Sequence, residues 1–363
     1  MSVFRTQRRG LFRRLLTGAI VTATGIGLTC TLAAPANAAT QQQLADYISA
    51  GAKKPVVAEN ILKGKSSWFA PRGNGPQQNS FLAAFGYGLT HPNVAPPGAN
   101  DWSCKPAAGQ KPVVLVHGTW ENAYDNWAMI SPTLKRAGYC VYALDYGILP
   151  TLSGGGLGPV LPGRFGTGDI AQSARQIRDF VNQVLKSTGA SQVNMVGHSQ
   201  GGTVSRQYIR YDGGDKKVAN LVTLAATNRG TTLVGIGALG RTINNIGIDV
   251  LGPVALLVGA SGIQQVYDSP FIKNLNKGNK FAIGDVHYTI VGSRYDEVTT
   301  PFESTFFPRG SKNTRNILLQ NGCEADTSDH VAMSYSPRAA SIVLNAFDPS
   351  HKIICAPNPW LIG

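Results

Sequence analysis

Residues 194–204 read NMVGHSQGGTV, an apolar run that ends in a serine set among glycines. Gly197, Ser199 and Gly201 match the G-x-S-x-G pattern of a nucleophile elbow, in which a serine is held on a tight turn between a strand and a helix. The chain has 42 glycines in 363 residues, so the bare pattern also arises by chance. The flanking segments therefore decide how this serine is interpreted.

Those flanking segments supply a strand and a helix. Residues 191–197 (SQVNMVG) read as a buried strand, and residues 200–211 (QGGTVSRQYIRY) read as a helix. A side chain at Gly197 or Gly201 would collide with these elements while the backbone is strained. We therefore interpret Ser199 as a catalytic nucleophile, with a serine in an ordinary buried turn as the alternative.

Strands and helices alternate along residues 111–363. The expected strands are 112–118, 139–147, 191–197, 218–226, 286–292 and 314–322, and the expected helices are 126–138, 169–189, 200–211 and 336–347. Helical crossovers between strands imply a mostly parallel sheet with helices on both faces. We expect an α/β fold for this domain.

Two further segments surround or interrupt this pattern. Residues 39–110 read as an irregular N-terminal arm, with one helix-like piece at 41–54 and Gly, Pro and Asn punctuation elsewhere. Its aromatic residues predict that the arm packs on the core. Residues 228–280 read as an insertion whose first part is apolar, rich in glycine and almost free of charge.

Residues 1–38 have the pattern of an export signal. Five arginines without an acidic residue precede a moderately apolar run, and Ala36–Ala38 (ANA) forms a small-x-small cleavage site. We expect a secreted protein whose mature chain begins near Ala39. A transmembrane anchor is the alternative, but Gly, Thr and Pro35 interrupt the run. The Arg8–Arg9 pair is only a weak indication of twin-arginine export.

The basic charge of the chain resides partly in this signal. Without the five arginines of residues 1–38, the chain keeps 28 basic and 20 acidic residues, a net charge of +8 instead of +13. The remaining Lys and Arg residues are scattered and form no stripe with interleaved aromatic residues. We therefore expect no nucleic-acid partner.

Four of the five cysteines belong to the mature chain, because Cys30 falls in the signal. An even number of cysteines in an exported chain predicts disulfides, here in one of three connectivities. We expect Cys104–Cys140 and Cys323–Cys355, since each pair is nearest in sequence and brackets a predicted strand. A zinc site is the alternative, but no C-x-x-C spacing is present, and we expect no metal.

A serine nucleophile needs a base, and placement favours His330. The other histidines lie in the arm (His91), in local turns (His117, His198), inside a strand (His287) or after the last helix (His351). His330 lies in the loop between the last strand and the last helix. We expect it to be the base, with His351 as the alternative.

The base in turn needs an acid to orient it. Asp296 lies just beyond the strand 286–292, and Glu297 beside it is the alternative. The chain order Ser199, Asp296, His330 is that of α/β-hydrolases.

A tetrahedral oxyanion needs N–H donors. The backbone N–H of Gln200, directly after the nucleophile, supplies one. The Thr119 N–H, in the turn after the first core strand, is expected to supply the second, with the Thr119 hydroxyl as a candidate third contact.

Four motifs in combination carry a family resemblance: PVVLVHGTW (112–120), GHSQGG (197–202), SRYDEVTTP (293–301) and DHVAMS (329–334). Together they resemble secreted bacterial class 2 triacylglycerol lipases, particularly actinobacterial ones with a DWSC stretch (101–104) before the first core strand. The resemblance covers roughly residues 100–350. It implies an α/β-hydrolase fold, hydrolysis of carboxylic esters, and the site residues named above, and it supports the Cys104–Cys140 bridge. No cofactor is required.

The insertion 228–280 and the arm distinguish this chain from the smallest members. We expect the insertion to act as a lid-like cap that roofs an acyl pocket or meets a lipid–water interface, with buried core as the alternative. The expected substrate is a lipid or another ester. A polyester depolymerase with the same triad is an alternative function, as is a non-catalytic binding module on a hydrolase scaffold.

Overall fold

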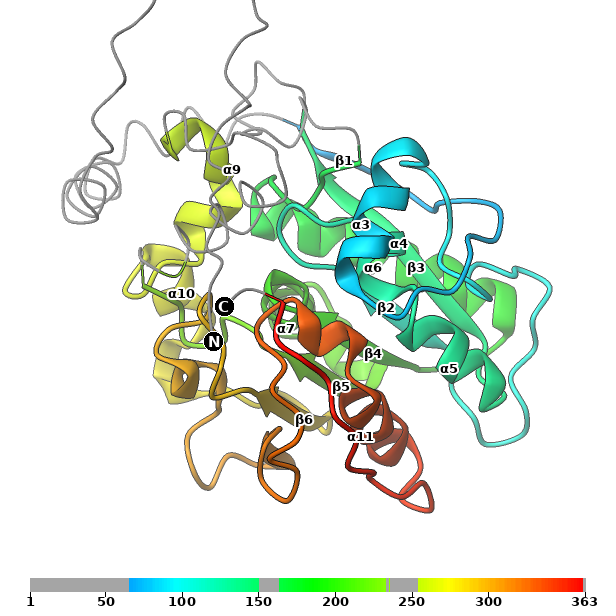
Figure 1. The fold of residues 1–363 in the computed structure, drawn as a ribbon. Coiled ribbons are helices and arrows are strands. Elements are labelled where there is room, and N and C mark those ends of the chain that lie inside the picture. Colours follow the sequence, from blue (N-terminus) through cyan, green and yellow to red (C-terminus); the bar gives the residue numbers. More distant parts are fainter. Residues whose placement is uncertain (1–64, 150–162, 233–234, 236–253, 362–363) are drawn as a thin grey trace, which may run out of the picture. The chain divides into compact units, whose positions relative to one another are not determined.

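The computed structural model describes residues 65–149, 163–232, 235 and 254–361 (Figure 1). The proposed signal segment 1–38, the helix-like piece at 41–54 and residues 236–253 of the insertion lie outside the described residues.

Seven strands of the described chain form one sheet in the order β1-β3-β2-β4-β5-β6-β7. Their bounds are β1 Ser67–Phe69, β2 Val113–Val116, β3 Val141–Ile148, β4 Val193–His198, β5 Val218–Leu224, β6 His287–Gly292 and β7 Thr314–Leu318. All neighbouring pairs from β3 to β7 are parallel, and β1 pairs antiparallel with β3. The six strands expected from the sequence all form, and the predicted α/β fold is confirmed.

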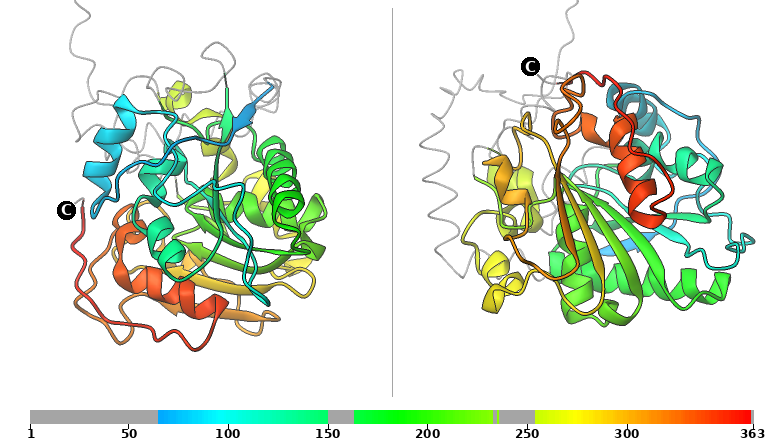
Figure 2. Two further views of the ribbon diagram at one scale, coloured as in Figure 1. Left: turned by 90° about the vertical axis from the view of Figure 1, so that its right-hand side faces the viewer. Right: turned by 90° about the horizontal axis from the view of Figure 1, so that it is seen from below.

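Helices cover both faces of this sheet (Figure 2). The α-helices are α3 Phe81–Thr90, α4 Ala123–Trp127, α5 Ile130–Arg136, α6 Ile170–Thr188, α7 Gln200–Tyr211, α9 Val254–Gln264, α10 Pro270–Leu275 and α11 Pro337–Phe347. The short 3₁₀ helices are η2 Gly214–Lys216, η3 Lys277–Asn279, η4 Phe302–Thr305 and η5 Ala332–Tyr335. No helix of the described residues is long and apolar enough to cross a bilayer.

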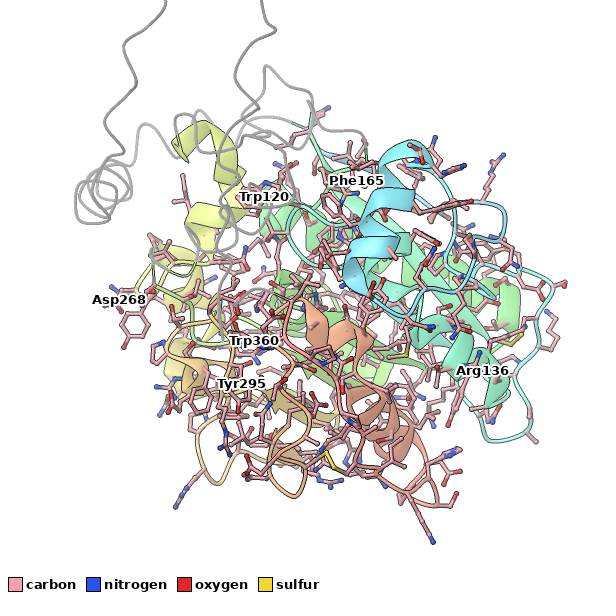
Figure 3. The ribbon with its side chains drawn as sticks, viewed as in Figure 1. Trp120, Arg136, Phe165, Asp268, Tyr295 and Trp360 are labelled. Carbon is pink, nitrogen blue, oxygen red and sulfur yellow. A yellow bond between two sulfur atoms is a disulfide. The ribbon has the colours of Figure 1, made fainter. Side chains whose placement is uncertain are left out.

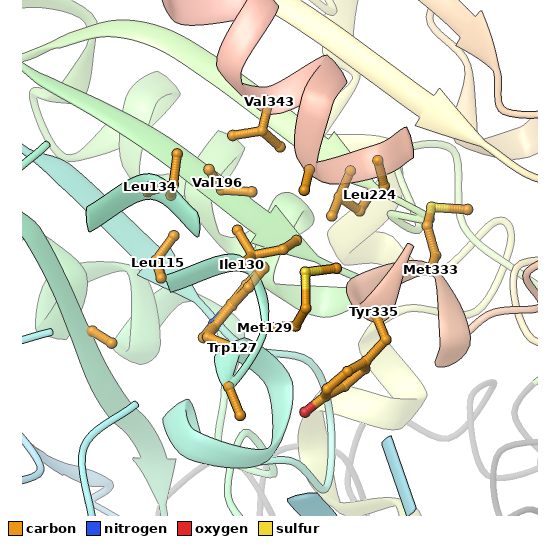
Figure 4. Close-up of a cluster of buried hydrophobic side chains, with 14 of the residues drawn as sticks. Leu115, Trp127, Met129, Ile130, Leu134, Val196, Leu224, Met333, Tyr335 and Val343 are labelled. Atoms are coloured by element: carbon orange, nitrogen blue, oxygen red, sulfur yellow. The ribbon is translucent and has the colours of Figure 1, made fainter. Parts of the chain in front are cut away.

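The alternation of side chains along β2 explains the two layers, because successive residues of a strand point to opposite faces. Val113 and Leu115 belong to a core cluster with α3, α4, α5 and α11, part of which Figure 4 shows. Val114 and Val116 belong to a second cluster with α6 and α7. The strands are therefore buried on both faces, as parallel sheets require.

The structure corrects two expectations about local structure. The helix expected over 126–138 forms as two helices, α4 and α5, which break at Ala128 and Met129. The arm is less irregular than expected, since it contains β1 and α3. Helix α3 begins at a Ser80 N-cap and buries Phe81 and Phe85 in the core.

Both expected disulfides are present. Cys104–Cys140 joins the arm to the start of β3, with a Cα–Cα distance of 5.7 Å. Cys323–Cys355 joins the loop after β7 to the segment after α11, with a Cα–Cα distance of 5.2 Å.

Candidate active site

Ser199 occupies a strained turn between β4 and α7. Its φ of 52° and ψ of −126° lie in a region that residues with side chains rarely adopt. The neighbouring glycines permit the turn. A Cβ on Gly197 would lie 2.5 Å from the Gly201 backbone, and a Cβ on Gly201 would overlap the Val116 carbonyl oxygen. The backbone therefore presents the Ser199 hydroxyl at the carboxyl end of the sheet.

Three side chains that are distant in sequence meet at this point. The Ser199 Oγ lies 2.9 Å from His330 Nε2, and His330 Nδ1 lies 2.9 Å from Asp296 Oδ1. Ser199 follows β4, Asp296 follows β6, and His330 lies between β7 and α11. All three are buried. The structure thus brings together the three side chains that the sequence predicts as nucleophile, acid and base.

The hydrogen bonds fix where the His330 proton lies. Asp296 accepts from Nδ1–H, so in the neutral ring Nε2 is free to accept from the Ser199 hydroxyl. Burial lowers the pKa of His330, but the charge and hydrogen bond of Asp296, together with Glu297 and Glu121, raise it to about 9. These surroundings favour the protonated form of the His330 ring.

Asp296 is held in place by its own loop. Its Oδ1 also accepts from the backbone N–H groups of Val298 at 2.9 Å and Thr299 at 2.7 Å. The acid therefore presents one fixed oxygen to the imidazole.

The alternative acid and base take other positions. Glu297 does not contact the His330 ring through a hydrogen bond; its Oε2 accepts from the His330 backbone N–H at 3.4 Å. Burial raises the pKa of Glu297 to about 7. His351 is partly exposed, and its Nε2 lies 3.9 Å from Asp348 Oδ2.

The two expected oxyanion donors belong to residues whose side chains contact each other. The Gln200 N–H is at the first position of α7, ahead of the hydrogen-bond ladder of the helix. The Thr119 N–H has no acceptor among the described residues. The Thr119 Oγ1 accepts from the side-chain amides of Gln200 at 2.7 Å and Gln265 at 3.0 Å. Gln265 follows α9, so the insertion 228–280 reaches the turn that carries Thr119.

A second segment supports the same turn. The Trp120 N–H donates to the Phe165 carbonyl at 2.9 Å, and the Phe165 N–H donates to the Glu121 carbonyl at 3.0 Å. Figure 3 labels Trp120 and Phe165, which lie close together. Trp120 has a φ of 58°, so the chain turns sharply directly after Thr119.

The sequence gives no pointer to Glu121 at the site, and it places His198 only in a local turn. Glu121 is buried, and its Oε2 accepts from the Gly118 N–H at 2.7 Å. The same oxygen lies 3.0 Å from Nδ1 of His198. A charged residue in a polar turn normally faces water, so the sequence carries no signal for this burial.

No group of three or more His, Cys, Asp or Glu residues within the described ranges is arranged to hold a metal ion.

The mostly parallel sheet and the elbow after β4 define an α/β-hydrolase. Residues 110–340 match the family model described as lipase (class 2), so the chain belongs to the class 2 lipase family. It is 34% identical over 131 residues to triacylglycerol lipases of Pseudarthrobacter phenanthrenivorans and Burkholderia plantarii. The match covers 34% of this chain, and 35% and 32% of those proteins, so the chain spans about a third of the length of these curated relatives.

The fold is also similar to that of Aspergillus fumigatus lipase B in a crystal structure. The TM-score is 0.50 at 18% sequence identity, and the similarity covers 78% of this chain and 66% of that chain.

Proposed function

We propose that this protein is a secreted serine hydrolase that cleaves carboxylic esters of apolar acyl chains, as a triacylglycerol lipase or esterase does. The observation that carries the proposal is the chain of two 2.9 Å contacts from Ser199 through His330 to Asp296. Membership of the class 2 lipase family supports the same chemistry.

In the proposed reaction, the Ser199 Oγ attacks the ester carbonyl carbon while His330 Nε2 takes up the hydroxyl proton. The resulting oxyanion accepts hydrogen bonds from the N–H groups of Thr119 and Gln200. His330 then donates its proton to the departing alcohol, which leaves an acyl-enzyme. Water attacks this ester by the same route in reverse, releasing the acid and restoring Ser199. Asp296 keeps the ring oriented throughout.

The apolar substrate class is supported by the position of the insertion. Gln265 contacts Thr119, so the segment after β5 borders the proposed oxyanion site. This segment begins with an apolar, nearly uncharged sequence, which suits contact with an acyl chain or a lipid–water interface.

Export is supported by the two disulfides, which persist in oxidising compartments. We infer that residues 1–38 direct the chain out of the cell. Mass spectrometry of protein from the culture medium is expected to give a mature N-terminus near Ala39.

The test combines a nucleophile variant with a covalent probe. We expect Ser199→Ala to lose hydrolysis of p-nitrophenyl esters and labelling by a fluorophosphonate, while its thermal unfolding stays close to that of the wild type. Wild-type rates in Ser199→Ala would refute the proposal. Initial rates on soluble esters, emulsified triacylglycerol and polyester film then identify the substrate class, and a preference for the film would replace the lipase proposal with depolymerisation.

A further inference from the structure

Glu121 and His198 form a buried pair beneath the proposed catalytic groups. Glu121 is 4% exposed and His198 is completely buried. The Glu121 Oε2 lies 3.0 Å from His198 Nδ1. Neither side chain has a part in the reaction sequence above. Each, however, is close in sequence to a group that does, since His198 precedes Ser199 and Glu121 follows Thr119 by two residues.

One end of this pair fastens the turn that carries Thr119. The same Glu121 Oε2 accepts from the Gly118 N–H at 2.7 Å. A Cβ built on Gly118 would overlap this carboxylate and lie 3.0 Å from the Ser199 Cβ, so the backbone there is packed tightly between the two side chains. Because the Gly118 N–H is directed to Glu121, the orientation of the His117–Gly118 peptide, one residue before Thr119, is fixed.

The other end of the pair holds the loop of the base. His198 Nε2 lies 2.8 Å from the backbone carbonyl oxygen of His330. A carbonyl oxygen only accepts, so Nε2 carries the proton of this hydrogen bond. The bridge also requires the opposite nitrogen, Nδ1, to carry a proton that is donated to Glu121, and the Asn126 side-chain amide lies 2.9 Å from this same nitrogen.

The charge of Glu121 suits its contacts with the Gly118 N–H and with His198. Burial alone would raise the pKa of Glu121, but the charge of His198 and its hydrogen bond, followed by His117 and His330, hold that pKa below its ordinary value. The carboxylate therefore accepts hydrogen bonds at neutral pH. Buried charged pairs add little net stability. The hydrogen bonds of this pair, in contrast, connect to the Gly118 N–H and to the His330 carbonyl.

We propose that Glu121 and His198 are positioning residues that couple the Thr119 oxyanion turn to the His330 loop through one continuous hydrogen-bonded bridge. The bridge runs from the Gly118 N–H through the carboxylate and the imidazole to the His330 carbonyl. This inference rests on the proposed function, because it assigns the pair to the alignment of that reaction.

The first test uses a disruptive and a conservative variant of Glu121. Glu121→Ala removes the acceptor for Gly118, and we expect kcat to fall about ten- to a hundred-fold, as misalignment of catalytic groups by about 1 Å does. KM is expected to stay within about twofold. Glu121→Gln keeps an amide oxygen that can accept from the same N–H, and we expect it to recover most of the lost kcat.

The second test uses two His198 variants, each of which retains the position of only one of the two ring nitrogens. The His198→Asn side chain reaches about as far as Nδ1 and loses the contact with the His330 carbonyl. The His198→Gln side chain reaches about as far as Nε2 and can donate to that carbonyl. Because each variant keeps one contact of the bridge and loses the other, we expect both to lower kcat. Wild-type kcat in both folded His198 variants decides against the proposal if Glu121→Ala fails to fold.

A double variant tests the coupling. Since either change breaks the same bridge, we expect Glu121→Ala with His198→Asn to lose no more kcat than the more damaging single change. Multiplied losses, or wild-type kcat in the folded single variants, would overturn the inference. The matched controls Glu303→Gln and His287→Asn change exposed residues and are expected to behave as the wild type.

All rates are expressed per active site titrated with the fluorophosphonate, so a smaller folded fraction does not count as lost kcat. The outcomes also separate the two proposals. If Ser199→Ala stays active, the proposed function fails. If Ser199→Ala is inactive and the Glu121 and His198 variants turn over normally, only the positioning bridge fails.

Discussion

Asn358 spans the loop that carries His330: its Nδ2 donates to Ser328 Oγ at 2.9 Å and to the Ala332 carbonyl at 3.0 Å, one on each side of the histidine. Asn358 lies near the end of the described chain, after the Cys323–Cys355 bridge. The C-terminal segment is thus packed directly against the segment that carries the proposed base.

We expect Asn358→Ala to loosen this loop. Two buried hydrogen bonds are lost and the Ala332 carbonyl loses its side-chain donor, so stability should fall by about 1–3 kcal/mol. The kcat should fall about three- to ten-fold because His330 is held less tightly. Urea unfolding and steady-state kinetics check both values. Asn93→Ala, at an exposed position, is the matched control, and equal behaviour of the two variants would contradict this role for Asn358.

The pH dependence of the reaction follows from the surroundings of His330. Burial lowers the pKa of this ring, but Asp296, Glu297 and Glu121 raise it to about 9. Only the neutral ring can take up the Ser199 proton, so kcat/KM should rise with pH as the ring loses its proton, with a midpoint near 9. A midpoint below 6.5 in the wild type would contradict this assignment.

Replacing Glu297 should change the pH dependence of kcat/KM selectively. Its carboxylate raises the pKa of His330 without bonding to the ring, so Glu297→Gln should move the rise in kcat/KM to lower pH. The kcat at the plateau should stay within several-fold of the wild type, since Asp296 remains. An unchanged or higher midpoint in a pH–rate profile would show that Glu297 does not act on His330 through its charge.

The strands and the position of Ser199 could be predicted because their signals are local. Buried parallel strands read as continuous apolar runs, and the elbow needs glycines at fixed spacing. His330 could be singled out among six histidines because it lies in the loop between the last predicted strand and the last predicted helix. Asp296 could be selected in the same way, because it lies just beyond the predicted strand 286–292, which forms β6.

The remaining features depend on contacts that no local pattern records. The three residues of β1 are too few to show an alternating pattern, and Gly86 and Gly88 obscure the helical pattern of α3. The burial of Glu121 depends on His198, which is brought beside it only by the pairing of β2 with β4. Tertiary structure, and not propensity, determines these positions.

The two disulfides should differ in their effect on catalysis. They close loops of similar sequence separation, 36 and 32 residues, so removing either should cost about 4 kcal/mol of stability. Replacing Cys323 and Cys355 by serine also frees the segment that holds the His330 loop, so kcat should fall several-fold at a temperature where the protein remains folded. The same change at Cys104 and Cys140 should leave kcat unchanged. Equal kcat for the two double variants would show that the C-terminal segment does not position His330.

Two glycines provide a matched test of the strained elbow. A Cβ on Gly201 would overlap the Val116 carbonyl oxygen, which is backbone of β2 and cannot move aside, so Gly201→Ala should lose about 3 kcal/mol or more. A Cβ on Gly86, inside α3, meets nothing within 4 Å, so Gly86→Ala should stabilise the protein by about 0.5–1 kcal/mol because alanine favours the helix. Thermal and urea unfolding measure both changes. If Gly201→Ala were as stable as the wild type, β4 and α7 could not be packed against β2 as closely as the elbow geometry requires.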